Sequence, residues 1–103
     1  MRFVRYLDAA EDDLNAIFDF VHVQSRSAQT ALAFVESIID RVSAIADQPF
    51  ELGRDRIELG HGLRSLPFGK YVLFFRYTDN GLEVVRIIEG HRDLDAQFDA
   101  PGR

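Results

Sequence analysis

The side chains best suited to binding an anion or an acidic partner are arginines, and they gather in the second half of the chain. A guanidinium binds a carboxylate or a phosphate through paired hydrogen bonds, which a lysine ammonium cannot do. The basic residues of this half include Arg54, Arg56, Arg64, Lys70, Arg76, Arg86 and Arg92. Acidic residues gather instead near the start of the chain, at Asp8, Glu11, Asp12, Asp13 and Asp19. This separation predicts a folded protein with one basic side.

The chain as a whole is acidic. It has 17 Asp and Glu against 12 Lys and Arg, a net charge of −5 and a pI near 5.0. Proteins that bind nucleic acids through phosphate contacts are usually basic, because their affinity grows with the number of phosphates neutralised. We therefore expect no strong direct nucleic-acid binding, although a local basic patch is compatible with a negative total.

His91 is the clearest candidate for acid–base chemistry, because an imidazole can donate or accept a proton near neutral pH. The alternative is an ordinary surface histidine after the last predicted strand. The three histidines show no metal-ligand spacing such as H-x-x-x-H, and the sequence has no cysteine. We expect neither a metal site nor a cofactor.

Length and composition predict one globular domain over residues 1–103, since 47% of the residues are hydrophobic. The absence of cysteine is compatible with the reducing cytoplasm. The start of the chain lacks an apolar signal segment, and no uncharged apolar run reaches the roughly 18 residues of a membrane span. The expected location is the cytoplasm, without a membrane.

Hydrophobic spacing predicts two helices after a short strand at Arg2–Leu7. The first helix begins with Asp8 as its N-cap, with Glu11 completing a capping box, and ends near Gln24. The second begins at a Ser27 cap and ends before Pro49. The short connection predicts an antiparallel helical hairpin.

Residues 49–62 read as an irregular loop, and three strands follow at Leu63–Pro67, Lys70–Thr78 and Leu82–Glu89. Asp79-Asn80-Gly81 is the strongest hairpin signal in the chain. The predicted fold class is therefore α+β: a short N-terminal strand, an antiparallel helical hairpin and a three-stranded antiparallel meander.

Arg76 and Arg86 fall inside the predicted hairpin, where structural pairing with carboxylates is the favoured interpretation. A two-residue Asn80-Gly81 loop would place them on opposite faces of the sheet. A three-residue loop with a bulge at Gly81 would place them on one face.

The strand from Tyr71 through Leu73 to Phe75 is apolar at consecutive positions, so both faces of the sheet carry hydrophobic side chains. Two helices cover only one face of a small sheet, and an exposed second face is normally polar. Either a partner covers the second face, or the chain does so itself with its tail, Leu94–Phe98, or with the 49–62 loop.

The sequence resembles the ParE branch of the RelE/ParE toxins of bacterial toxin–antitoxin pairs over nearly the whole chain. The matching segments, in order, are D-D-L-N-A-I-F-D-F, the proline after the second helix, G-L-R-S-L-P, K-Y-V-L-F-F-R-Y, V-V-R-I-I and R-D-L. The resemblance implies a type II toxin that inhibits growth by poisoning DNA gyrase through protein contact. One departure is Glu89, where such chains often have a histidine that stands here at position 91.

The resemblance also implies partners, and the charge distribution and the two-faced strand indicate which residues contact them. The partners are a cognate antitoxin, in a hetero-oligomer, and DNA gyrase. We expect Tyr71, Leu73 and Phe75 to contact the antitoxin, and the target contact to use three arginines, Arg64, Arg86 and Arg92.

Two other interpretations stay open. In a ribosome-dependent mRNA interferase, Arg64 would bind phosphate and His91 would act as acid or base. In a degenerate relative, the chain would only bind its antitoxin. A salt bridge from Arg64 to Asp55 or Glu58 is the structural alternative for that arginine.

Overall fold

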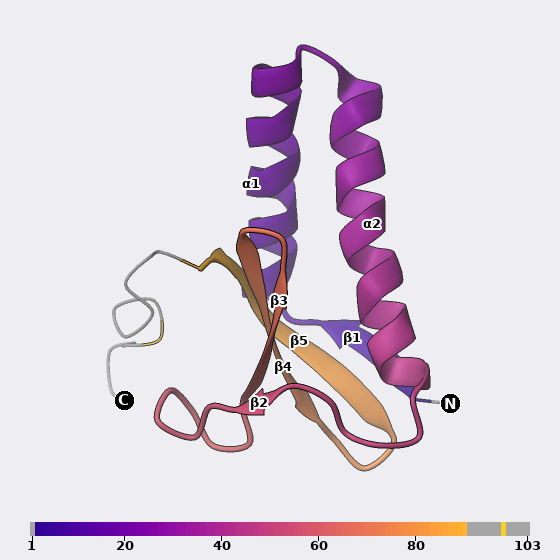
Figure 1. Cartoon of the computed structure of the whole chain (residues 1–103), viewed down its shortest axis with the longest axis vertical. Helices are drawn as coiled ribbons and strands as arrows, with labels where there is room; N and C mark the ends of the chain where they lie inside the picture. The colour runs from indigo at the N-terminus through magenta and orange to yellow at the C-terminus, as the bar shows by residue number, and fades with distance from the viewer. Residues whose placement is uncertain (1, 91–97, 99–103) are drawn as a thin grey trace.

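The computed structural model describes residues 2–90 and 98, and it confirms the predicted α+β class. Figure 1 shows two helices side by side and a twisted sheet toward one end of the hairpin. The strands form one sheet in the order β1-β5-β4-β3-β2, antiparallel except where β1 runs parallel to β5. The elements are β1 (Phe3–Tyr6), α1 (Asp8–Ser25), α2 (Ala28–Asp47), β2 (Arg54–Asp55), β3 (Arg64–Phe68), β4 (Tyr71–Tyr77) and β5 (Gly81–Glu89).

The two helices start differently. The residue before α1 is Leu7, and no side chain caps this end, so the prediction of an Asp8 cap is wrong. Asp8 and Glu11 lie instead in the first turn, where their negative charge favours the positive end of the helix dipole. At α2 the predicted cap is confirmed, because the Ser27 hydroxyl accepts a hydrogen bond from the Thr30 N–H at 3.1 Å.

The parallel pairing of β1 with β5 depends on a small residue at the start of β5. Gly81 pairs with Phe3, and a Cβ on Gly81 would lie 3.1 Å from the Phe3 carbonyl oxygen and 2.8 Å from the Thr78 hydroxyl. Gly81 therefore permits the close approach of β1. The turn between β4 and β5 is closed by a 2.9 Å hydrogen bond from the Thr78 N–H to the Gly81 carbonyl, with Asp79 and Asn80 between them.

The main core lies between the helices and one face of the sheet. Alternate residues of β4 point into it, and β5 supplies Leu82, Val84 and Ile87. The predicted antitoxin contacts Tyr71, Leu73 and Phe75 are buried there. In this structure the core between the helices and the sheet encloses all three side chains, so their contact with an antitoxin stays a prediction.

The second face of the sheet is covered by the chain itself. Leu59 and Leu63, from the loop between β2 and β3, pack with Phe74 and Ile88 in a second cluster. The Phe98 ring also reaches this cluster, with its centroid 4.7 Å from that of Phe74. Of the two explanations for a two-faced apolar strand, cover by the chain's own loop is the one observed here.

The loop that provides this cover is held by backbone hydrogen bonds. Arg56 donates from its N–H to the Leu63 carbonyl at 2.8 Å, and Leu59 donates to the Arg56 carbonyl at 2.9 Å.

In the part of the chain that the structure describes, neither helix is apolar enough to cross a membrane.

Candidate functional site

Arg64, at the start of β3, binds the backbone of the preceding loop. Its Nε donates to the Leu52 carbonyl at 2.7 Å, and its Nη2 donates to the Gly53 carbonyl at 2.8 Å. Neither expected carboxylate is its partner: the Asp55 side chain accepts from the Ile57 N–H at 3.0 Å, and Glu58 accepts from the Nε of Arg56 at 2.7 Å. Arg64 therefore fastens the loop to the sheet.

Gly53 explains how the loop can come this close. It has a φ of +87°, and a Cβ there would lie 2.9 Å from both the Phe75 ring and the Ser65 carbonyl oxygen. Only glycine fits without a shift of the backbone. The carbonyl that Arg64 binds is thus positioned by a residue without a side chain.

A hollow of about 300 Å³ lies beside Arg64 and is lined by Glu51, Asp55, Ile57, His61, Gly62, Arg64 and Tyr77. It brings a guanidinium together with an imidazole, His61, that the sequence did not single out. The Tyr77 hydroxyl accepts from the Leu52 N–H at 2.9 Å and so helps to hold the same loop. Two carboxylates at this hollow oppose the binding of an RNA phosphate.

His61 and Arg64 are three residues apart in the sequence, and this spacing is the one sequence feature that could have indicated that they line the same hollow. Tyr77 joins them only because β3 and β4 pair in antiparallel register.

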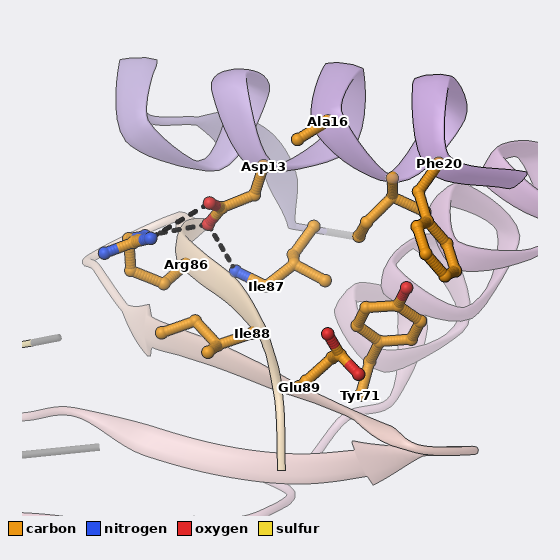
Figure 2. Close-up of a pocket in the computed structure, with 9 residues that line it drawn as sticks. Asp13, Ala16, Phe20, Tyr71, Arg86, Ile87, Ile88 and Glu89 are labelled. Carbon is orange, nitrogen blue, oxygen red and sulfur yellow. Dashed lines mark hydrogen bonds and ion pairs between the residues drawn. The ribbon is translucent and has the colours of Figure 1, made fainter. Parts of the chain in front are cut away.

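Arg86 is bound to helix α1. Its Nε and Nη2 donate to the two oxygens of Asp13 at 2.7 and 3.0 Å. The same carboxylate accepts the Ile87 backbone N–H at 2.8 Å. Figure 2 shows the Asp13 side chain reaching from α1 to Arg86 and Ile87 on β5.

This contact fills a gap at the edge of the sheet. β1 pairs with β5 only as far as Val84, so Ile87 has no strand beside it on that side. Asp13 supplies the Ile87 N–H with the acceptor that a neighbouring strand would otherwise supply. The hydrogen bond between the Arg86 side chain and Asp13 is also the main reason why the pKa of Arg86 is raised. The structural interpretation of Arg86 is therefore confirmed, and its partner is an acid from the first helix.

A small hollow of about 140 Å³ adjoins this pair, with Ala16, Ile17, Phe20, Tyr71, Ile88 and Glu89 in its lining. The Lys70 Nζ lies 5.0 Å from the centroid of the Phe20 ring, which lines this hollow. This contact is a cation–π interaction on a partly exposed aromatic ring.

Arg76 takes part in a cross-strand group on neighbouring strands. Its Nε lies 3.5 Å from a carboxylate oxygen of Glu83, whose other oxygen lies 3.3 Å from Nη1 of Arg5. The three residues are in register on β1, β5 and β4. The structural pairing expected for Arg76 is thus observed.

The irregularity that sets the faces of Arg76 and Arg86 is not at Gly81. The register shifts between Phe74 and Phe75, where β5 carries the extra residue Val85. Arg86 pairs with Phe74 and Arg76 with Glu83, so the two arginines lie on the same side of the hairpin by register.

Two of the candidates, His91 and Arg92, lie outside the described residues. Within residues 2–90 and 98, no cluster of His, Asp and Glu side chains could hold a metal ion.

The chain shares sequence and fold with known toxins. A family model described as the ParE toxin of the type II toxin–antitoxin system parDE matches residues 4–94. Toxin ParE3 of Caulobacter vibrioides is 31% identical over 88 residues, which are 84% of this chain and 84% of that protein.

Among solved structures, the fold is similar to a chain of the chromosomal ParDE toxin–antitoxin system from P. aeruginosa. The TM-score is 0.71 at 26% sequence identity, and the match covers 86% of this chain and 96% of that chain. The order of elements, the mixed sheet and these matches all point to one family. The chain belongs to the ParE toxins of type II toxin–antitoxin systems.

Proposed function

We propose that the chain inhibits bacterial growth in the cytoplasm by binding DNA gyrase, and that a cognate antitoxin neutralises it in a hetero-oligomer. Family membership supports the antitoxin partner. The gyrase target is implied by the resemblance to ParE-type toxins. The observation that favours protein contact over RNA cleavage is the placement of Arg64.

Arg64 is the residue that an mRNA interferase would use to bind phosphate. Its guanidinium donates instead to the carbonyls of Leu52 and Gly53. The adjoining hollow contains the carboxylates of Glu51 and Asp55, which repel phosphate. The guanidinium therefore already binds the carbonyls of the loop, and the negative charge beside it disfavours the binding of RNA.

The target contact is proposed in the C-terminal half of the chain, where the arginines gather. Arg64 and Arg86 act there mainly by holding the loop and the β5 edge in place. Arg92 and the residues that follow it are the segment through which we propose that the chain contacts gyrase directly.

The test begins with expression of the chain alone, and with its antitoxin, in a bacterial host. We expect growth arrest without the antitoxin and normal growth with it. In vitro, the purified chain should inhibit DNA supercoiling by gyrase and leave mRNA on translating ribosomes intact. Cleavage of that mRNA without an effect on supercoiling would contradict the proposal.

Two variants separate the possible mechanisms. His91→Ala should keep growth inhibition, whereas a ribonuclease that uses His91 as its acid would lose about 10²- to 10⁴-fold in rate. Deletion of residues 91–103 should weaken gyrase inhibition more than antitoxin binding. A folded deletion variant that still inhibits gyrase fully would exclude this segment as the contact.

A further inference from the structure

The loop between α2 and β3, residues 48–63, is held by contacts with the rest of the chain. Leu52 packs against the main core, and Leu59 lies in the second cluster. Arg64 binds two carbonyls of the loop at 2.7 and 2.8 Å, and the Tyr77 hydroxyl accepts the Leu52 N–H at 2.9 Å. The conformation of the loop is therefore set before any partner binds, which lowers the entropy cost of binding.

This loop nevertheless exposes large apolar side chains. Ile57 is 67% exposed and Phe50 is 56% exposed. The turn around Ile57 is fixed, because the Asp55 carboxylate accepts the Ile57 N–H at 3.0 Å and Leu59 is the residue of this turn that enters the second cluster. Exposed apolar side chains on a loop held in this way are typical of a surface that contacts another protein.

Ile57 also lines the hollow of about 300 Å³ beside Arg64, which has two carboxylates in its lining, those of Glu51 and Asp55. Within residues 2–90 and 98 neither carboxylate forms an ion pair. The Nε and Nη2 of Arg64 are turned to the loop carbonyls. The lining therefore favours a cation over an anion, and its volume is at the small end of ligand pockets, which suits one long side chain.

A lysine or arginine side chain of another protein matches both properties of the hollow. Its aliphatic stem can pack on Ile57, and its charged end can pair with Glu51 and Asp55. A second copy of this chain is disfavoured by its net charge of −5. The target of the toxin is the favoured partner, because the hollow adjoins Arg64, one of the arginines expected at the target contact.

We infer that this hollow receives a lysine or arginine side chain of the target protein, and that Ile57 packs against the apolar surface beside that side chain. Arg64 is then a positioning residue, which holds the loop and does not touch the target. The inference rests on the proposed gyrase target and adds a second contact to the segment that begins at Arg92.

The first test is Ile57→Lys, which places a positive charge at the hollow. The readout is the toxin concentration that half-inhibits DNA supercoiling by purified gyrase, and it should rise at least about tenfold, as for loss of a central interface residue. The melting temperature and the affinity for the cognate antitoxin should not change, because Ile57 is exposed.

Val23→Lys is the matched control for this variant. Val23 is 73% exposed in the last turn of α1, and Figure 1 shows this end of the helical hairpin far from β2 and its loop. The control makes the same change of side chain and charge away from the hollow. It should inhibit gyrase as the wild type does.

The second test removes the negative charge with Glu51→Gln/Asp55→Asn. Asparagine keeps an oxygen that can accept the Ile57 N–H, so the turn should persist. Binding to immobilised gyrase should weaken on the order of tenfold at low salt, and less at high salt, because exposed ion pairs are screened. Asp19→Asn/Asp40→Asn makes the same change of charge at exposed positions of the two helices and should bind as the wild type does.

The outcomes separate this inference from the proposed function. A wild-type toxin that does not inhibit gyrase would overturn both. A wild-type toxin that inhibits gyrase, with hollow variants that inhibit it equally, would overturn the hollow and leave the gyrase target intact.

Two further outcomes would replace the occupant of the hollow. Hollow variants that lose antitoxin binding and still inhibit gyrase would show that the hollow receives the antitoxin. A free toxin that dimerises, becomes monomeric on Ile57→Lys in sedimentation experiments and inhibits gyrase as before would show that a second copy occupies the hollow. Either result would overturn the inference.

Discussion

Replacing Asp13 by alanine should destabilise the toxin far more than a surface charge change does. The Asp13 carboxylate accepts two hydrogen bonds from Arg86 and one from the Ile87 N–H, at 2.7 to 3.0 Å. Asp13→Ala removes all three acceptor contacts at once. It leaves a guanidinium and an edge N–H of the sheet without this partner.

The magnitude follows from the burial of the pair. Removal of one partner of a fully buried ion pair costs about 3 to 5 kcal/mol, and an exposed pair contributes about 0.2 to 1 kcal/mol. The side chains of Arg86 and Asp13 are 23% and 15% exposed, so water can partly replace the lost contacts. We expect a loss of about 2 to 3 kcal/mol in the free energy of unfolding, or roughly 8 to 24 °C in melting temperature.

The assay is urea unfolding followed by circular dichroism, on a graded series of variants. Asp13→Asn keeps an oxygen that can accept the Ile87 N–H but loses the charge, so its cost should fall between wild type and Asp13→Ala. Asp12→Ala is the matched control, since Asp12 is the exposed neighbour on the same helix. It also measures the gain in helix propensity that alanine brings.

A double-mutant cycle with Arg86→Ala isolates the ionic contact from the backbone contact. Contacting residues of this kind show coupling energies of about 0.5 to 3 kcal/mol. A loss of stability in Asp13→Ala no greater than in Asp12→Ala, or a coupling energy below about 0.5 kcal/mol, would contradict this prediction. The pair would then act as a solvated surface pair, and Arg86 would be available for a target.

Three further predictions concern single side chains. Arg64→Gln should lower the free energy of unfolding by about 1 to 2 kcal/mol, measured by urea unfolding. Arg64→Lys should also be less stable than the wild type, because an ammonium cannot make the two hydrogen bonds to the loop carbonyls in the same geometry. The hydrogen bond from Arg56 lowers the pKa of Glu58 below 4.5, so its contribution to stability is present above that pH and is lost as the pH falls through the lowered pKa. Carbon-detected NMR titration should show this, with Arg56→Gln returning the Glu58 pKa toward its ordinary value. For Tyr6, whose pKa rises from 10.0 to about 12, stability should decline as the pH rises through that interval, and absorbance at the tyrosinate band should show a late phase that Tyr6→Phe removes. A tyrosinate titration without a late phase in the folded protein would contradict the last of these.

The helices and the central hairpin follow from local patterns. Apolar residues at helical spacing, a serine cap at Ser27 and a breaker at Pro49 predict α2 nearly to the residue. β4 and β5 follow from dense β-branched and aromatic runs around the Asp79-Asn80-Gly81 turn. These signals need no knowledge of the rest of the fold, because each depends on residues a few positions apart.

The groups that the arginines bind could not be predicted from the sequence in the same way. Arg64, Arg76 and Arg86 were visible as candidates, but their partners are a pair of loop carbonyls, a cross-strand glutamate and a helix aspartate. Asp13 lies 73 positions from Arg86 and looked like one more acid on a solvated helix face. Only the packing of α1 beside the free edge of β5 brings the two together.

The same distinction applies to the two faces of the sheet. The sequence of β4 determined that both of its faces are apolar. Each face therefore had to be buried by another part of the protein or by a partner. Which face each cover takes depends on long-range packing: the helices lie over Tyr71, Leu73 and Phe75, and Leu59 and Leu63 fold over Phe74. Periodicity determines which residues share a face of their own element, whereas the tertiary structure alone decides what that face meets, because this depends on the burial and hydrogen bonding of the whole chain.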